Sequence, residues 1–222
     1  MLQLGTKYHI DTLRQDAIHR LSEYFPSELG SFTNIYTDED VSLLDEFIGG
    51  ALDIRARNAI AVVTLAQRCN VPRFLPTAFY LCAQLEMDEI LCGYTDEDGS
   101  HWELSKEDMK RCLLGQQALR LNSQKRDRFV LEAKHCLTCN TRNTQQCTTV
   151  LERYRKYWWD TGGDDSRALY QSSWIANLGL CGSCLSHFNY KHDAVIKETW
   201  GDLAHCFDLE VKWPIPYEEI VG

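Results

Sequence analysis

The chain has 222 residues, of which 44% are hydrophobic and 25% are charged. These values are typical of globular proteins and exclude a wholly disordered chain. Lys and Arg number 23 against 32 Asp and Glu, so the formal net charge is -9, which repels phosphate and disfavours a nucleic-acid partner. No segment is apolar over the roughly 18 residues that a membrane span needs, and residues 1–8 lack the pattern of a secretory signal. We therefore expect an intracellular protein, cytoplasmic or nuclear, without a membrane partner.

The first half of the chain shows helical patterns. Asp11 is expected to cap a helix that ends before Pro26, and residues 54–69 predict a central helix that is apolar on nearly every side. A second buried helix is expected over 78–82. The apolar residues that set the first helical period are Leu13, Ala17, Leu21 and Tyr24.

The second half is also predicted to be helical. After a short extended piece at 101–104, Ser105 is expected to cap a long helix that runs to about Lys134, with Glu107 and Asp108 placed favourably against the helix dipole. Residues 135–146 have a loop-like composition. Further helices are expected over 148–159, over 166–178 and from Gly182 towards Trp200. The fold class is therefore all-α, a helical bundle or array, with helical regions over 1–134 and 135–222, the second carrying a small Cys-rich subdomain.

Two Cys-x-x-Cys pairs, Cys136–Cys139 and Cys181–Cys184, are the strongest chemical signal. Such spacing lets both sulfurs face one ion, and two pairs supply the four ligands of tetrahedral Zn²⁺. We therefore take Cys136, Cys139, Cys181 and Cys184 as the candidate metal ligands. Four further residues could replace one of them: Cys147, His135, His187 and His192.

Two other interpretations of the paired cysteines stay open. They could be reduced core or loop residues whose spacing is accidental, or a redox pair. A thioredoxin-like pair follows a β-strand, whereas Cys181 follows a predicted helix, so redox chemistry is the least favoured. Five other cysteines have apolar neighbours and are predicted to be small core residues: Cys69, Cys82, Cys92, Cys112 and Cys206.

Residues 153–159 mix basic and aromatic side chains, as nucleic-acid surfaces do. On a helix, however, Leu151, Tyr154 and Trp158 share one face and are predicted to belong to the core. Arg155 and Lys156 then lie on the solvated side. No catalytic motif of the hydrolases, nucleotide-binding proteins or zinc proteases occurs in the chain, so we do not expect an enzyme.

The order of many positions resembles the helical region that follows the BTB core in fungal, basidiomycete-type BTB/POZ domain-containing proteins. The resemblance makes residues 1–134 a BTB-distal, BACK-like region. The residues that carry it are Leu2, Leu4, Lys7, Tyr8, Leu13, Ala17, Leu21, Phe25, Pro26, Leu65, Ala66, Val71, Pro72, Leu75, Pro76, Thr77, Ala78, Phe79, Tyr80, Ile90, Gly93, Leu104, Ser105, Asp108, Cys112, Leu113, Leu114, Gly115, Cys181, Cys184, Trp200, Leu203, Phe207, Leu209 and Trp213.

This resemblance implies a non-catalytic module for protein–protein interaction. The BTB core would lie before Met1, so the dimerisation and ligase docking that it mediates do not carry over to this chain. Two alternatives remain: a zinc-stabilised domain that binds nucleic acid, and an enzyme with a Cys nucleophile. The cofactor is unassigned apart from the candidate structural zinc, and the identity of the protein partner is unknown.

Overall fold

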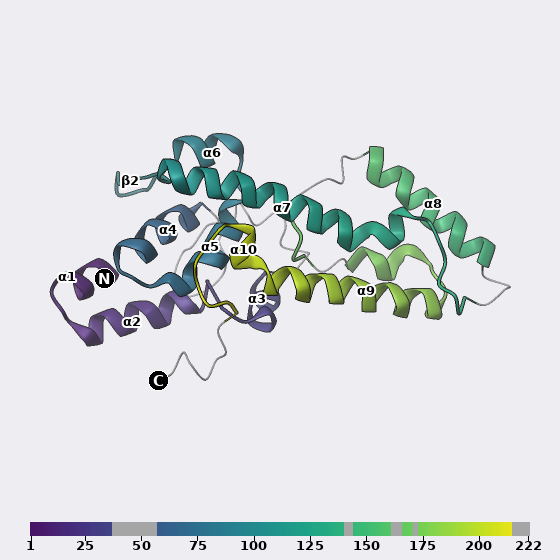
Figure 1. Ribbon diagram of the computed structural model, residues 1–222, viewed down its shortest axis with the longest axis horizontal. Helices are drawn as coiled ribbons and strands as arrows, with labels where there is room; N and C mark the ends of the chain where they lie inside the picture. Colours follow the sequence, from purple (N-terminus) through teal and green to yellow (C-terminus); the bar gives the residue numbers. More distant parts are fainter. Residues whose placement is uncertain (37–56, 140–143, 161–165, 171–172, 215–222) are drawn as a thin grey trace. The chain divides into compact units, whose positions relative to one another are not determined.

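A computed structural model describes residues 1–36, 57–139, 144–160, 166–170 and 173–214 (Figure 1). The chain forms two compact units, which we call unit 1 (residues 1–117 and 200–222) and unit 2 (residues 118–199). Helices dominate both units, and the described residues contain one two-stranded sheet. The all-α prediction is confirmed. The sequence suggested a boundary near residue 135, whereas unit 2 starts at residue 118 and the chain returns to unit 1 at residue 200.

The N-terminal part of unit 1 is a series of short helices. Asp11 is the first residue of α2 rather than its cap; Ile10 holds the cap position and makes no side-chain capping hydrogen bond. The predicted central helix begins at Asn58, and residues 54–56 lie outside the described residues. The elements are α1 (Leu2–Lys7), α2 (Asp11–Ser22), α3 (Leu29–Ile35), α4 (Asn58–Arg68), η2 (Pro72–Phe74), α5 (Leu75–Cys82) and α6 (Met87–Cys92).

Helix α5 forms the centre of unit 1, because every one of its residues is buried. Aromatic rings pack around it. The Phe32 ring lies 5.4 Å from the ring of Tyr80 and 5.2 Å from that of Trp200, and the Phe79 and Phe207 rings stack at 5.5 Å. Such ring pairs contribute beyond the area that they bury. Unit 1 therefore has an apolar core of its own.

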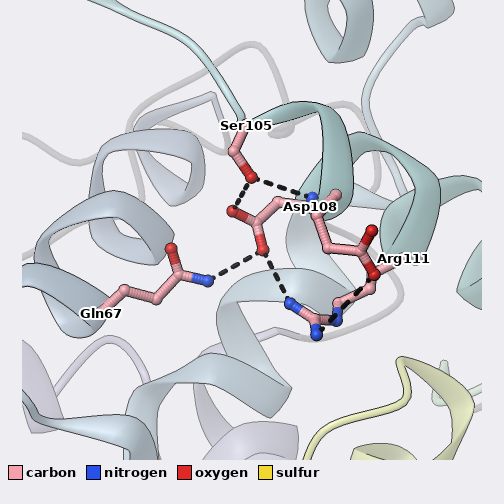
Figure 2. A network of polar contacts seen from close by, with 5 residues as sticks. Gln67, Ser105, Asp108 and Arg111 are labelled. Carbon is pink, nitrogen blue, oxygen red and sulfur yellow. Dashed lines mark hydrogen bonds and ion pairs between the residues drawn. The ribbon is translucent and has the colours of Figure 1, made fainter.

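A hairpin and a capping network start the longest helix. Strands β1 (Tyr94–Thr95) and β2 (His101–Trp102) pair antiparallel and lead into α7 (Lys106–Leu131). The backbone N–H of Asp108 donates to Ser105 Oγ at 3.1 Å, which confirms the predicted cap, and Ser105 Oγ donates to the Asp108 carboxylate at 2.6 Å (Figure 2). Gln67 Nε2 donates to the same carboxylate at 2.8 Å and Arg111 Nη1 lies 3.3 Å from it. The buried Asp108 is thus satisfied and serves the helix start.

Unit 2 contains the end of α7 together with α8 (Thr144–Asp160), η3 (Ser173–Leu178) and most of α9 (Gly182–Gly201). The prediction of a helix over 166–178 is confirmed only in its last part, because residues 166–170 form a bend and a turn and 173–178 form a 3₁₀ helix. Arg126 gives the reason: its Nη1 donates to the carbonyl of Arg167 at 2.6 Å and to that of Tyr170 at 3.3 Å. These two carbonyls accept hydrogen bonds from a side chain that is distant in sequence, instead of from the backbone N–H groups of a helix. Residues 171–172 lie outside the described part.

The other predicted helices of unit 2 are found. On α8, Leu151 and Trp158 are buried, Tyr154 is half-buried, and Arg155 and Lys156 are exposed, as the helical pattern predicts. Short helix α10 (Leu203–Cys206) follows α9 in unit 1. In the described part of the chain, no helix has both the length and the apolarity that a membrane crossing needs.

The five isolated cysteines divide into three environments. Cys69, Cys82 and Cys112 are buried, as predicted, and Cys206 is half-buried. Cys92 is exposed, so its assignment to the core is wrong. It is the last residue of α6, where only Ile90 is buried. Burial raises the pKa of the Cys112 thiol to about 12, so that group is a neutral core residue.

Candidate metal centre

Three segments of unit 2 deliver four cysteines to one place. Cys139 ends a turn after α7, in which its N–H donates to the carbonyl of Cys136 at 3.0 Å. Cys147 lies in the first turn of α8. Cys181 precedes α9 and accepts the N–H of Leu185 on its carbonyl at 2.9 Å, and Cys184 lies in the first turn of that helix. Two helix starts and one tight turn therefore fix the positions of the sulfurs.

The four sulfur atoms have the spacing of a tetrahedral site. Cys139, Cys147, Cys181 and Cys184 place their Sγ atoms within 4.8 Å of one another. The Sγ atoms of Cys139 and Cys181 are 3.7 Å apart. A Zn–S bond of about 2.3 Å in a tetrahedron puts neighbouring sulfurs about 3.8 Å apart. The Cys139 and Cys181 sulfurs already have this spacing, and separations of up to 4.8 Å elsewhere in the group can close around one Zn²⁺ ion through small side-chain movements.

Backbone N–H groups support two of these sulfurs. The N–H of Cys181 donates to Cys147 Sγ at 3.3 Å, and the N–H of Cys136 donates to Cys184 Sγ at 3.4 Å. Hydrogen bonds of this kind stabilise thiolates and orient metal ligands. They occur here at two sulfurs that are buried, where water cannot supply them.

Cys136 lies beside the group and not within it. Its own Sγ is 3.5 Å from Cys184 Sγ and 3.4 Å from Thr138 Oγ1. The structure thus brings together three of the four residues that the sequence pattern selected, Cys139, Cys181 and Cys184, and adds Cys147. The fourth, Cys136, contributes its backbone N–H to the neighbouring sulfur.

The candidate histidines lie elsewhere, and none belongs to the sulfur group. His135 Nδ1 is 3.0 Å from the carbonyl of Cys136, and the His187 ring contacts that of Phe188. His192 is buried 3.8 Å from Asp193; burial and the nearby Arg126 guanidinium lower the pKa of this imidazole to about 4. His192 is therefore a neutral core residue at pH 7.

The thiols of the group influence one another. The backbone N–H of Cys184 and further hydrogen bonds lower the pKa of the Cys181 thiol to about 7. Removal from water and neighbouring sulfurs raise the pKa of Cys139 and raise that of Cys184 strongly. Without a cation, one thiolate forms readily and further ones are opposed. A divalent cation compensates the charge of all four thiolates, so this donor set fits a metal.

An apolar cluster packs against the buried side of the sulfur group, while Cys139 and Cys181 are half-buried. Cys136, Cys147 and Cys184 belong to a buried cluster against which Cys139 and Cys181 pack, and the other buried members are Val130, Ala133, Leu151, Ile175 and Phe188. Four protein sulfurs complete a tetrahedron and leave no coordination position for water or substrate. That closure is the mark of a structural site rather than a catalytic one.

The sequence held a signal for Cys147 beyond its role as a substitute ligand. Cys147, Leu151, Tyr154 and Trp158 recur at helical spacing, so Cys147 lies on the inward face of α8. An inward cysteine at the start of a helix is directed towards the same core as the paired cysteines. The Cys-x-x-Cys spacing of Cys136 and Cys139 was the stronger pattern, so the sequence favoured Cys136 over Cys147 as the fourth ligand.

Comparisons of this chain with known protein families, with curated proteins and with solved structures found no significant match. The resemblance to the region after a BTB core therefore stays a prediction. The functional proposals below rest on the geometry of the described residues.

Proposed function

We propose that this chain is a non-catalytic protein-interaction module whose unit 2 is held in shape by one structural Zn²⁺ ion. The ligands are Cys139, Cys147, Cys181 and Cys184. The observation that carries the proposal is that their four sulfurs, from three separate segments, lie within 4.8 Å of one another.

The geometry favours a single ion. Four thiolates in a tetrahedron select zinc or iron, and a multi-iron cluster would need room between its ligands. Cys139 and Cys181, with sulfurs 3.7 Å apart, leave space for one ion. Zinc has no redox chemistry, which agrees with a site whose four sulfurs leave no open coordination position.

The centre explains how unit 2 keeps its shape. It joins the turn after α7, the start of α8 and the start of α9, three segments that are distant in sequence. Structural zinc sites contribute free energy of binding directly to folding, on the order of 10 kcal/mol in small domains. A module stabilised in this way keeps its outer helix faces available for partners. Because thiolates must stay reduced to hold zinc, we place the protein in the cytoplasm or nucleus.

Elemental analysis tests the metal part of the proposal. The full chain, purified under reducing conditions without chelator, is expected to contain about one zinc per chain. Cys147→Ser and Cys184→Ser should each lose most of the metal, because three thiolates bind zinc far more weakly than four. Cys92→Ser is the matched control, since this exposed thiol lies in unit 1. A folded chain without metal, or zinc that survives both substitutions, would refute the proposal; iron in place of zinc would overturn the choice of metal.

Thiol titration separates the metal site from a redox pair. The chain has ten cysteines, and all are free in the structure. The unfolded, chelated protein should therefore react as ten thiols even when it is isolated in air. Loss of two thiols, mapped by mass spectrometry to a Cys139–Cys181 disulfide, would favour redox chemistry instead.

A further inference from the structure

Charge is divided unevenly between the two units. Unit 2 contains twelve Lys and Arg against eight Asp and Glu, whereas the rest of the chain contains eleven against twenty-four. The expectation about partners that used the whole-chain charge therefore does not describe unit 2. Its surface favours negatively charged partners, and unit 1 does not.

Helix α8 concentrates these features on its outer face. Arg153, Arg155 and Lys156 are exposed there, and the exposed fractions of Tyr157 and Trp159 are 60% and 67%. Residues four apart on a helix are neighbours, so Arg153 pairs with Tyr157 and Arg155 pairs with Trp159. The two pairs occupy the two flanks of the exposed side, with Lys156 between them. We call these five residues the α8 face.

Both exposed rings contact an inner ring of the same helix. The Tyr157 ring lies 6.1 Å from that of Tyr154, and the Trp159 ring meets the ring of Trp158 edge-on at 4.8 Å. Trp158 is buried, and Tyr154 packs against the cluster that contains the sulfurs. Contacts of this kind restrict the exposed side chains, which reduces the conformational entropy that they lose when a partner covers them. The α8 face is thus prepared for binding and connected to the metal centre.

We propose that the α8 face binds an acidic segment of a partner protein. Arg, Tyr and Trp are the residue types that dominate binding energy at protein interfaces, and guanidinium groups pair with carboxylates through two parallel hydrogen bonds. The 17-residue helix is about 25 Å long and can accompany about seven extended residues. The partner segment lies along the Arg155 and Trp159 flank, where it places a carboxylate against Arg155 and an apolar side chain against Trp159. This inference rests on the proposed zinc centre, which holds α8 in position.

Two acidic residues on α8 favour a protein over a nucleic acid as the partner of the α8 face. Glu152 and Asp160 are both exposed within the α8 face, one helical turn before and after Lys156. A continuous phosphate backbone would meet them with like charge, whereas a protein segment can carry its carboxylates only where the arginines are. The strongly acidic remainder of the chain also opposes a polyanion more than it opposes a few carboxylates.

Peptide selection tests the proposal. A phage library of random 12-residue peptides is selected on the zinc-loaded full chain, and peptides that also bind the Tyr157→Ala/Trp159→Ala variant are removed. The surviving peptides should be enriched in Asp and Glu relative to the starting library. Peptides without that enrichment would overturn the proposal.

Fluorescence anisotropy with the best selected peptide then measures the contributions of single residues. Arg155→Ala and Trp159→Ala should each weaken binding about tenfold, and binding should weaken further as salt rises. Tyr8→Ala is the matched control, because Tyr8 is 59% exposed and lies beside Lys7 in unit 1. Unchanged affinity in both α8 variants, or a 20-residue oligothymidine that binds more tightly than every peptide and depends on the same residues, would overturn the proposal.

Zinc is measured on every sample, so that the two proposals fail separately. Variants of the α8 face should keep about one zinc per chain while they lose the peptide. A chain without zinc that still binds acidic peptides through Trp159 would refute the zinc centre and leave the peptide site intact.

Discussion

At the scale of single residues, Cys136 differs from its four cysteine neighbours because it serves the centre through its backbone N–H and not through its sulfur. Its N–H donates to Cys184 Sγ, and its own sulfur lies outside the four-sulfur group. Cys136→Ala keeps that N–H, so we expect it to retain about one zinc per chain. Cys147→Ala removes a ligand and should lose most of the zinc. Elemental analysis and competition with a chromogenic chelator compare the two variants; the opposite pattern would restore the ligand set that the sequence suggested.

The same two residues show what a sequence can say about such a site. The Cys-x-x-Cys spacing indicated a convergence of sulfurs, and three of the four members of the group follow from it. The fourth depends on where α8 begins relative to the turn after α7. That distance is set by packing of Leu151, Val130 and Phe188 in three dimensions, and it leaves only a weak periodic trace in the sequence.

At the scale of helices, Gly115 allows α7 to approach α10. A Cβ atom at this position would lie 2.1 Å from two carbon atoms of the buried Phe207 ring. The ring is fully buried and stacked on Phe79, so a shift away from the new methyl group would disturb that packing. Gly115→Ala should therefore lower the free energy of unfolding by about 1–3 kcal/mol, the usual cost of overpacking. Urea denaturation followed by circular dichroism measures this change.

Gly201→Ala provides the comparison, because nothing lies within 4 Å of a Cβ placed at the end of α9. It should leave stability unchanged or raise it slightly, since Ala favours a helix more than Gly does. Equal effects of the two substitutions would show that Phe207 moves freely, contrary to the packing described.

Helices could be predicted where their causes are local. The cap of α7 needs only Ser105 and Asp108, three residues apart, and both were recognised. The turns over 166–170 depend on Arg126, about forty residues earlier, whose guanidinium takes the carbonyls that a helix would use. A local sequence pattern cannot indicate a contact with a residue so far away, so the helix expected over 166–170 was wrong.

At the scale of the whole molecule, composition concealed the division of the chain. The acidic average is the sum of a basic unit 2 and a strongly acidic remainder. The division cannot be found from a change of composition alone, because it falls inside α7 and the chain returns to unit 1 within α9. Only the separate cores reveal it: aromatic rings around α5 in one unit, and sulfurs with Leu151 and Phe188 in the other.

Removal of zinc should therefore act on one unit. With a strong chelator at pH 7, we expect faster hydrogen–deuterium exchange over 144–160 and 182–199, because the thiolates lose the cation that compensates their charge within an apolar cluster. Exchange over 59–82 should not change, because that segment belongs to the core of unit 1. Ligand thiols must lose their protons to bind zinc, and the raised pKa values of Cys139 and Cys184 show that protons compete with the metal, so less chelator should suffice as the pH falls. Loss of protection in both units would show that the cores depend on each other, and loss in neither would show that the metal is not structural.

Exchange of the Cys92→Ser variant, followed under the same conditions, should match that of the unmodified chain, because its thiol is exposed in unit 1 and takes no part in the centre.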